Sequence, residues 1–552
     1  MDPIIECVPN FSEGNNTELI RQITDQIEGV AGVRLLNVDP GKATNRTVVT
    51  LVGAPAAVIE AAFRAIKRAG ELIDMSMHKG EHPRMGATDV CPLIPIAGIS
   101  MEETAEWAKR LAQRVGSELK LPVYLYEAAQ PDKSRSNLSV IRAGEYEGLE
   151  TKIRQPAWKP DYGPAEFDAK RGATVIGARD FLVAYNVNLN TTSTRRANAV
   201  AFDVREAGRV RREGNPPVNV SVPGRLKAVK AIGWYIEEYG IAQISMNLTN
   251  IQITPVHIAF DEVCRSAAER GLRVTGSELV GLIPLRAMLD AGKYFLQKQQ
   301  RSIGVSEKEL IRMAVLSMGL DELAPFNPEE RIIEYLLRDK ADSRLVRMSL
   351  EDFADLTASE SPAPGGGSIS AYVGALGASL GAMVANLSSH KKGWDDRWAE
   401  FGDWAARGQQ AKDELLKWVD ADTRAFNRIM AAFALPKATP AESAARSSAI
   451  QEATKEAMTV PLRVMQSAYA SMELIRAMAE TGSPNSVSDA GVGALCARTA
   501  VMGAYMNVRI NAAGCEDKEF AASTLAKGRE IENKAIAMET EILRIVNEKI
   551  GV

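Results

Sequence analysis

The sequence is poor in histidine and lacks paired cysteines. Its 552 residues include 4 histidines and 5 scattered cysteines, and no C-x-x-C motif occurs. A disulfide framework or a structural zinc site is therefore not expected. Lys+Arg number 66 and Asp+Glu 70, so the chain lacks the basic excess of proteins that bind nucleic acids or anionic membranes. Residues 1–14 also lack the basic-then-apolar pattern of a signal peptide, and we expect a cytoplasmic protein that binds neither nucleic acid nor membrane.

One segment without charge is long enough to span a membrane. Residues 361–389 contain no Asp, Glu, Lys, Arg or His. Much of the segment is Gly, Ala and Ser, which are only weakly hydrophobic, and it begins with a glycine loop. This composition favours a helix buried in a tightly packed soluble bundle.

The first 327 residues alternate strand and helix patterns, which indicates two α+β domains. In the first domain we expect strands at 4–9, 33–39, 44–53, 88–96 and 122–127 and helices at 17–29 and 55–75. The strands at 33–39 and 44–53 are expected to form a hairpin around the Pro40-Gly41 turn. In the second domain we expect strands at 180–190 and 242–250 and helices near 194–208, 225–240 and 256–270.

From Ser349 onward the strand patterns end and long alanine-rich helical stretches follow. We expect helices at 369–389, 395–432, 441–480, 487–513 and 516–550, packed as a bundle of five or six helices. The expected domains are therefore 1–180 and 181–327, a charged linker at 328–347, and an all-α domain at 348–552.

Half of the histidines lie in the segment HKGEHPRMG, residues 78–86. His78 and His82 have the i, i+4 spacing of a metal pair on a helix, but the intervening and following glycine and proline make a helix improbable, and no third ligand is near. Two interpretations stay open. The segment is a surface loop that caps the preceding helix, or one histidine acts as a general base while Lys79 and Arg84 bind substrate anions.

Several segments resemble the formiminotransferase-cyclodeaminase family. IIECVPNFSEG (4–14), DMSMHKGEHPRMGATDVCPLIPI (74–96), IRAGEYEGL (141–149) and GRLKAVKAIGWY (224–235) are similar to its formiminotransferase part. SPAPGGGS (361–368), VDADT (419–423) and SVSDA (486–490) are similar to its cyclodeaminase part, in the family's order. One departure is a longer stretch at 205–219, inside the second α+β domain.

The resemblance implies a bifunctional folate enzyme of histidine degradation. Two α+β subdomains, ferredoxin-like in fold, would form a transferase that moves the formimino group of N-formimino-L-glutamate to tetrahydrofolate and releases glutamate. The helical-bundle domain would then close the ring of 5-formiminotetrahydrofolate to 5,10-methenyltetrahydrofolate and release ammonia. It also implies tetrahydrofolate with a polyglutamate tail as substrate, no metal or nucleotide cofactor, and a homo-oligomer, in the family a ring-shaped octamer.

The family's transferase histidine falls on His82, whose neutral imidazole is suited to remove the proton from the attacking folate nitrogen. Residue type suggests that Arg46, Lys79 and Arg84 bind carboxylates. Two polar residues at strand ends, Asn10 and Asp39, are candidates for lining a cleft. Two readings of Asp39 stay open: it binds the cationic amidinium, or it forms the turn before Pro40. The loop 161–172 matches the family's folate-binding stretch, and its candidate residues are Gly163, Pro164, Glu166, Phe167 and Gly172. Phe167 either stacks on the folate or anchors the loop.

In the helical domain, the family's catalytic aspartate falls on Asp422. A partly buried carboxyl at this position could deliver a proton to the departing ammonia and remove one from the attacking nitrogen. Asp420 would point about 200° away on a helix, so the two do not form a carboxylate dyad. The candidate binding residues are Gly365, Gly366, Gly367, Ser368, Ser488 and Asp489, of which the last two are also good helix caps.

Two alternatives stay open. The helical domain could be a methenyltetrahydrofolate cyclohydrolase, which would release no ammonia. The whole chain could also be a non-catalytic folate-binding scaffold, although the presence of His82 and Asp422 in their motifs speaks against this reading.

Overall fold

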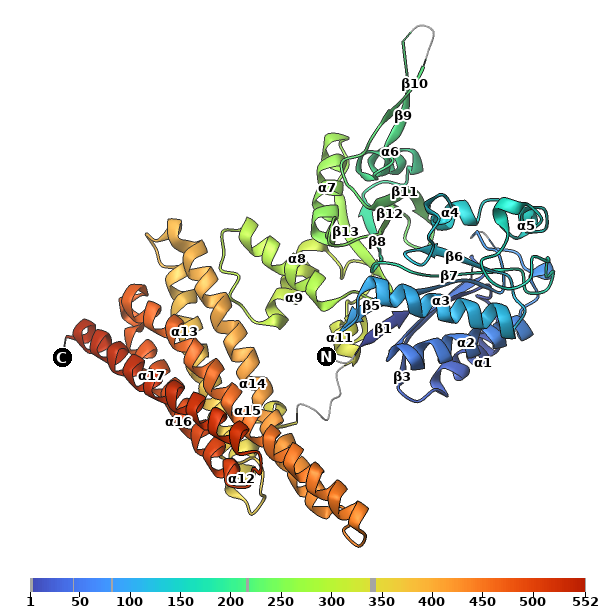
Figure 1. Cartoon of the computed structure of the whole chain (residues 1–552). Helices are drawn as coiled ribbons and strands as arrows, with labels where there is room; N and C mark the ends of the chain where they lie inside the picture. Colours follow the sequence, from blue (N-terminus) through green and yellow to red (C-terminus); the bar gives the residue numbers. More distant parts are fainter. Residues whose placement is uncertain (1–2, 43, 81–82, 215–217, 338–343, 552) are drawn as a thin grey trace. The chain divides into compact units, whose positions relative to one another are not determined.

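The computed structural model describes residues 3–42, 44–80, 83–214, 218–337 and 344–551 (Figure 1). They form two compact units, residues 1–287 with 318–336 and residues 288–317 with 337–552. The contacts therefore group residues 288–317 with the helical unit, whereas the sequence boundaries place them in the second α+β domain. The other expected boundaries stay predictions.

The first α/β part is built on one seven-stranded sheet. Its strands are β1 (Ile4–Cys7), β2 (Asn10–Phe11), β3 (Val33–Gly41), β4 (Arg46–Gly53), β5 (Thr88–Ala97), β6 (Val123–Glu127) and β7 (Thr174–Ala178). The order is β1-β4-β2-β5-β7-β6, with β3 paired to β4, and only the β5–β7 and β6–β7 pairs are parallel among these described strands.

Helices cover both faces of this sheet. They are α1 (Thr17–Glu28), α2 (Pro55–Leu72), α3 (Met101–Glu118), α4 (Leu138–Ile141) and α5 (Glu145–Ile153). The first three pack on the sheet (Figure 1). Alternate residues of β4 and β5, such as Val49, Leu51 and Cys91, are buried in the core beneath them. A second core contains Val90, Val175 and Leu149 and lies against α4 and α5 on the other face.

The hairpin of β3 and β4 turns later than expected. Pro40 and Gly41 lie inside β3, opposite Thr47 and Arg46, so the connection falls after Gly41. β3 pairs with β4 alone among the described strands, and an edge position tolerates proline because its missing N–H costs no ladder hydrogen bond there.

The second α/β part has a four-stranded antiparallel sheet in the order β11-β12-β8-β13. Its elements are β8 (Val183–Leu189), α6 (Thr194–Val204), β11 (Val229–Ile236), β12 (Ile241–Leu248), α7 (Val256–Glu269) and β13 (Val274–Val280). The helix expected near 225–240 is wrong, because β11 occupies this region with alternating buried and exposed residues. Gly233 of β11 packs against α6, where an added Cβ would lie 2.2 Å from the backbone nitrogen of Asn198.

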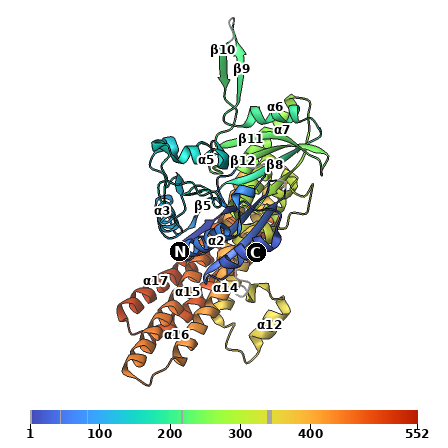
Figure 2. The ribbon, with the colours of Figure 1, turned by 90° about the vertical axis from the view of Figure 1, so that its right-hand side faces the viewer.

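The stretch that departs from the family forms a separate hairpin of β9 (Arg209–Glu213) and β10 (Val218–Val222). It projects from the second sheet, and its residues are largely exposed (Figures 1 and 2). Asp203 anchors its base, accepting hydrogen bonds from Arg209, Arg270 and Ser266.

Part of the expected linker is folded. Residues 328–337 contain α10 (Pro328–Arg331) and α11 (Ile333–Leu337), and Ile332 and Ile333 are buried. Ile332 forms a bridge with Ile283 next to β13. The expectation of a linker therefore missed two core residues in this segment, Ile332 and Ile333.

The second unit is helical in its described residues. It contains most of α8 (Leu285–Lys298) and α9 (Glu307–Met318), followed by α12 (Leu350–Ala358), α13 (Gly366–Ser389), α14 (Trp398–Ala434), α15 (Pro440–Thr481), α16 (Val487–Ala512) and α17 (Lys518–Ile550). The long helices lie side by side around an alanine-rich core (Figures 1 and 2). The expected helices and the bundle architecture are thus confirmed.

α13 is the one described helix long and apolar enough to cross a membrane, and 61% of its most apolar stretch is buried inside the protein. Its small residues allow close packing, since an added Cβ at Gly377 would lie 2.8 Å from the carbonyl oxygen of Gly493 on α16. These contacts support the buried-helix interpretation.

Candidate functional sites

The start of the histidine-rich segment, residues 78–80, lies against Thr44 and Asn45 before β4. His78 Nε2 lies 2.9 Å from the carbonyl oxygen of Asn45, and Asn45 Nδ2 donates to the carbonyl oxygen of Lys79 at 2.8 Å. Gly80 permits this approach, because a Cβ there would lie 2.3 Å from the carbonyl oxygen of Thr44. His82 falls outside the described residues, so its predicted role is untested. The described residues contain no cluster of three or more His, Cys, Asp or Glu side chains able to hold a metal.

Arg46 and Asn10 come together as a pair on the sheet face opposite α1–α3. Arg46 Nε donates to Asn10 Oδ1 at 2.8 Å, and Arg46 Nη1 lies 2.7 Å from Asp89 Oδ2. Asp89 is fully buried and also accepts hydrogen bonds from Arg142 and from the backbone N–H of Met85. Burial lowers the pKa of Arg46 to about 10, against the opposing effect of Asp89.

The sequence reasoning missed Asp89 and Arg142. Asp89 lies within the expected strand 88–96, and Arg142 follows the end of α4, far from Asp89 in the sequence. Asp39 lies on the same face as Asn10, because both are paired with Val48 of β4, and its side chain is exposed.

Arg84 is nearly buried and is already paired. Its Nη2 lies 2.6 Å from Glu147 Oε1, its Nη1 lies 3.1 Å from Glu145 Oε2, and its Nε donates to His78 Nδ1 at 3.3 Å. The hydrogen bond with Glu147 raises the pKa of Arg84. A substrate carboxylate would have to displace Glu147 to bind here, whereas the side chain of Lys79 is exposed. Both ring nitrogens of His78 have partners, which fits a supporting role.

The loop 161–172 ends beside the histidine segment. Gly172 has a φ of +69°, forms a bridge with Gly86, and leaves no room for a Cβ, which would lie 2.1 Å from the carbonyl oxygen of Met85. Gly163 similarly has a φ of +82° and packs on Leu121. Phe167 packs on Tyr146 with ring centroids 5.6 Å apart, which fits the loop-anchoring interpretation. Pro164 is half-buried and Glu166 is exposed.

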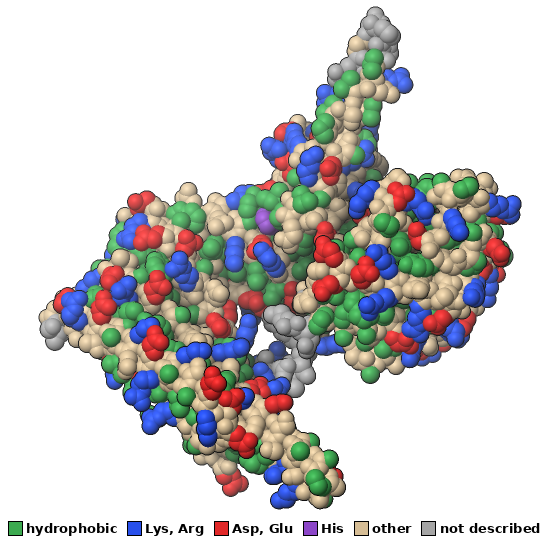
Figure 3. Space-filling view, in the orientation of Figure 1, with side chains coloured by type: hydrophobic (Ala, Val, Ile, Leu, Met, Phe, Trp, Pro, Cys, Tyr) green, Lys and Arg blue, Asp and Glu red, His purple; other side chains and the backbone are tan. Residues whose placement is uncertain are grey.

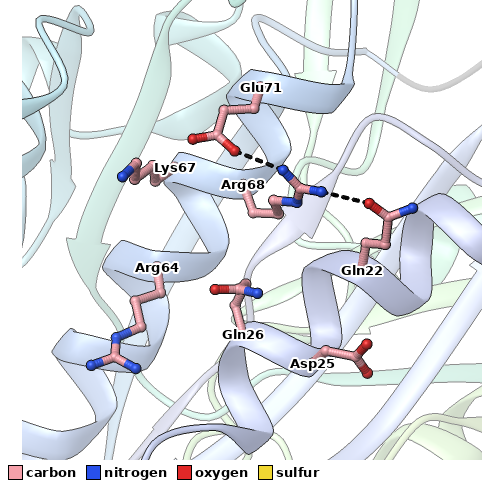
Figure 4. Close-up of a pocket in the computed structure, with 7 residues that line it drawn as sticks. All are labelled: Gln22, Asp25, Gln26, Arg64, Lys67, Arg68 and Glu71. Atoms are coloured by element: carbon pink, nitrogen blue, oxygen red, sulfur yellow. Dashed lines mark hydrogen bonds and ion pairs between the residues drawn. The ribbon is translucent and has the colours of Figure 1, made fainter.

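A separate groove of about 460 Å³ lies between α1 and α2 (Figure 4). There Arg68 contacts Glu71 and Gln22 at 2.9 and 2.6 Å. The groove is on the side of the sheet that α1, α2 and α3 cover, and none of the predicted site residues lines it. On the face drawn in Figure 3, acidic and basic side chains are interspersed.

In the helical unit, the glycine segment meets the predicted catalytic aspartate. Ser368 Oγ donates to Asp422 Oδ2 at 3.2 Å and to the carbonyl oxygen of Val419 at 2.8 Å, and it lies 3.2 Å from Thr423 Oγ1. An added Cβ at Gly367 would lie 2.0 Å from Asp422 Oδ1. The carboxyl group therefore lies directly against the N-terminus of α13. Burial raises the pKa of Asp422, while hydrogen bonds from the hydroxyl and backbone N–H of Ser368 oppose the rise.

Asp420 binds different groups from those that Asp422 contacts, which confirms that the two aspartates do not form a dyad. Its carboxylate accepts hydrogen bonds from the backbone N–H groups of Leu345 and Val346 at 2.8 and 3.3 Å. Asp420 thus ties the start of the helical unit to α14.

Ser488 and Asp489 do not join Asp422 within this chain. They begin α16, whereas it is Asn507, near the other end of this helix, that lies beside Gly366. Eighteen residues of α-helix separate Asn507 from Asp489, which is about 27 Å. The sequence could not reveal this separation, because it depends on the direction in which α16 runs along α13.

The α/β unit and the helical unit each contain their own cluster of candidate residues, as expected of an enzyme with two catalytic domains. Family models match residues 4–179 (Formiminotransferase domain, N-terminal subdomain), 184–338 (Formiminotransferase domain) and 349–530 (Formiminotransferase-cyclodeaminase). The chain therefore belongs to the formiminotransferase-cyclodeaminase family.

Three relatives illustrate the match. The chain is 45% identical to the mouse (Mus musculus) formimidoyltransferase-cyclodeaminase, over 95% of each chain. It is 42% identical to the Dictyostelium discoideum formimidoyltransferase-cyclodeaminase, over 100% of each chain. A methenyltetrahydrofolate cyclohydrolase from Methylorubrum extorquens is 36% identical over 37% of this chain and 98% of its own length.

Proposed function

We propose that this protein catalyses two consecutive reactions on folate: glutamate formimidoyltransfer in its α/β unit and formimidoyltetrahydrofolate cyclodeamination in its helical unit. The observation that carries the proposal is the match over the full length of a bifunctional relative, with all three family domains in order.

In the transferase reaction, N5 of tetrahydrofolate attacks the formimino carbon of N-formimino-L-glutamate. The new C–N bond forms as the attacking nitrogen loses its proton, and the bond to the glutamate nitrogen then breaks with return of a proton. We assign this transfer to His82. Arg46 and Lys79 are the proposed carboxylate partners, and the loop ending at Gly172 is the proposed folate contact.

In the second reaction, N10 of 5-formiminotetrahydrofolate attacks the same carbon and the formimino nitrogen leaves as ammonia. N10 must lose a proton and the departing nitrogen must gain one, so a single carboxyl group can carry the proton between them. Asp422 is suited to this role because its burial favours the protonated form while Ser368 still holds it in place.

A second candidate for the helical unit is a methenyltetrahydrofolate cyclohydrolase, favoured by the match to the Methylorubrum enzyme. The two candidates differ in product, because only the cyclodeaminase releases ammonia.

We further propose a cytoplasmic homo-oligomer, arranged as a ring-shaped octamer, that acts on polyglutamylated tetrahydrofolate without a metal or nucleotide cofactor. A tethered tail would raise the effective concentration of the intermediate at the second site. Oligomerisation is supported by the outward faces of α13 and α16, where large apolar side chains are 38% to 73% exposed. These residues are Leu376, Met383, Leu387, Val492, Leu495, Met506 and Ile510. The strand order β11-β12-β8-β13, with α6 and α7 as crossovers, supports a ferredoxin-like second subdomain.

The test is a paired assay on the full chain. Purified protein receives N-formiminoglutamate and tetrahydrofolate, and glutamate, ammonia and methenyltetrahydrofolate are measured together. We expect wild type to form all three, His82→Ala to form none, and Asp422→Ala to release glutamate without ammonia. Glutamate without ammonia from wild type would favour the cyclohydrolase candidate, and no product from folded protein would overturn both.

A further inference from the structure

The glycine segment at the start of α13 has polar side chains on two sides. Asp422 of α14 touches Gly367, as described above. Next to it, a Cβ at Gly366 would lie 3.5 Å from Asn507 Nδ2 and 3.9 Å from Asn507 Oδ1. The carboxyl group of Asp422 and the carboxamide of Asn507 therefore both adjoin the start of α13, and a Cβ at Gly366 would be in ordinary contact with the carboxamide.

The orientation of the Asn507 amide is fixed by its own helix. Asn507 Nδ2 donates to the carbonyl oxygen of Gly503, one turn earlier, at 2.9 Å. Gly503 itself packs against Ser370 of α13. This hydrogen bond uses one donor of the amide and leaves Oδ1 as an acceptor beside the glycine segment.

The substrate of the proposed reaction has a group that needs such an acceptor. The formimino group is an amidinium, a planar cation with N–H donors, and its terminal nitrogen becomes the departing ammonia. We infer that Asn507 is a substrate-binding residue whose Oδ1 accepts an N–H of this terminal nitrogen, beside the same glycine segment that Asp422 adjoins. This inference rests on the proposed cyclodeaminase function. No further proton transfer is required of Asn507, because Asp422 carries the proton from N10 to the leaving nitrogen.

Two substitutions separate a binding role from a packing role. Asn507→Leu removes both the Oδ1 acceptor and the bond to Gly503, whereas Asn507→Asp also removes the bond to Gly503 but keeps an acceptor oxygen. Ammonia release from supplied 5-formiminotetrahydrofolate is measured for both in the full chain. We expect kcat/KM to fall about 10- to 100-fold in Asn507→Leu, the size of a lost hydrogen bond to a charged group, and clearly less in Asn507→Asp. Glutamate release should be unchanged in both.

Asn511→Leu is the matched control. Asn511 is also a half-buried amide on α16, one turn further along, but it donates to the carbonyl oxygen of Ala457. Its ammonia release should stay within about twofold of wild type, as expected for a residue outside the site. The inference is overturned if Asn507→Leu keeps wild-type kcat/KM, or if Asn507→Asp loses as much as Asn507→Leu.

A binding measurement distinguishes failure of this inference from failure of the proposed function. The affinity for 5-formiminotetrahydrofolate is measured by equilibrium fluorescence in the Asp422→Asn background, with and without Asn507→Leu. If wild type releases no ammonia, the proposed function fails, yet weaker binding with Asn507→Leu would still support the contact. Equal binding, or no saturable binding in either variant, overturns it.

Discussion

The position of the Asp422 carboxyl depends on the absence of a side chain at residue 367. In Gly367→Ala, the new Cβ would lie 2.0 Å from Asp422 Oδ1, whereas ordinary contacts begin at 3.4 Å. The carboxyl group must therefore move by about 1.4 Å, away from residue 367. A displacement of about 1 Å can cost a reacting group roughly 100-fold in rate, so we expect ammonia release to fall at least this much.

The cost in stability should be small. Overpacking costs about 1–3 kcal/mol, and replacing glycine by alanine in a helix recovers up to about 1 kcal/mol. Folded Gly367→Ala protein should therefore release glutamate at the wild-type rate but hardly any ammonia. Gly514→Ala is the control, because its nearest neighbour is 3.8 Å away. If Gly367→Ala released ammonia within threefold of wild type, the carboxyl would not need its place at the end of α13, and the assignment of Asp422 would be refuted.

Three further predictions concern stability and can be read from urea unfolding. Burial raises the pKa of Glu6 from 4.5 to about 7, so its protonated form contributes stability that is present below pH 4.5 and lost as the pH rises through 7. The free energy of unfolding of Glu6→Gln, relative to wild type, should therefore increase by about 3 kcal/mol between pH 4 and pH 9. A difference that stays constant with pH would contradict this prediction. Arg46→Gln should destabilise the α/β unit by about 3–5 kcal/mol because it removes one partner of the buried Asp89. A loss below about 1 kcal/mol would show that Arg142 alone is enough to stabilise the buried Asp89 carboxylate. Asp420→Ala should cost the helical unit about 1–3 kcal/mol by leaving backbone N–H groups without an acceptor, with ammonia release per folded molecule unchanged.

Local sequence patterns predicted the helical unit better than the α/β unit. Long alanine-rich runs have few competing conformations, and the helices from α13 to α17 begin and end close to the expected residues. In β11 the residues Lys230, Ile232 and Trp234 are exposed and Val229, Ala231 and Gly233 are buried. Because apolar residues occur on both faces of this strand, the sequence does not show the two-residue period of a strand clearly, and it predicts a helix instead. Pairing with β12 makes this segment a strand, and the local sequence of the segment does not reveal that partner.

The same distinction separates the predicted from the missed site residues. Motifs predicted Asp422 and Ser368, and the structure brings them together. Asp89 and Arg142 carry no motif and meet only because β5 and the turn after α4 are neighbours in space. Asn507 is recognisable only from its position beside Gly366, which requires coordinates.

The arrangement at Asp422 shows how the fold sets a proton-transfer group between two opposing effects. Free N–H groups at the start of a helix and the Ser368 hydroxyl favour an ionised carboxylate, while burial favours the neutral acid. Because burial is the larger effect, the pKa of Asp422 is raised, yet the hydrogen bonds from Ser368 keep the ionised form accessible. A carboxyl group balanced in this way can both accept the N10 proton and give it up to ammonia, whereas an exposed aspartate would hold the proton too weakly to donate it. Removing the hydroxyl in Ser368→Ala should therefore raise the pKa of Asp422 further and shift the pH dependence of ammonia release to higher pH, with glutamate release as the internal control. An unchanged or acid-shifted profile would show that Ser368 does not stabilise the ionised form.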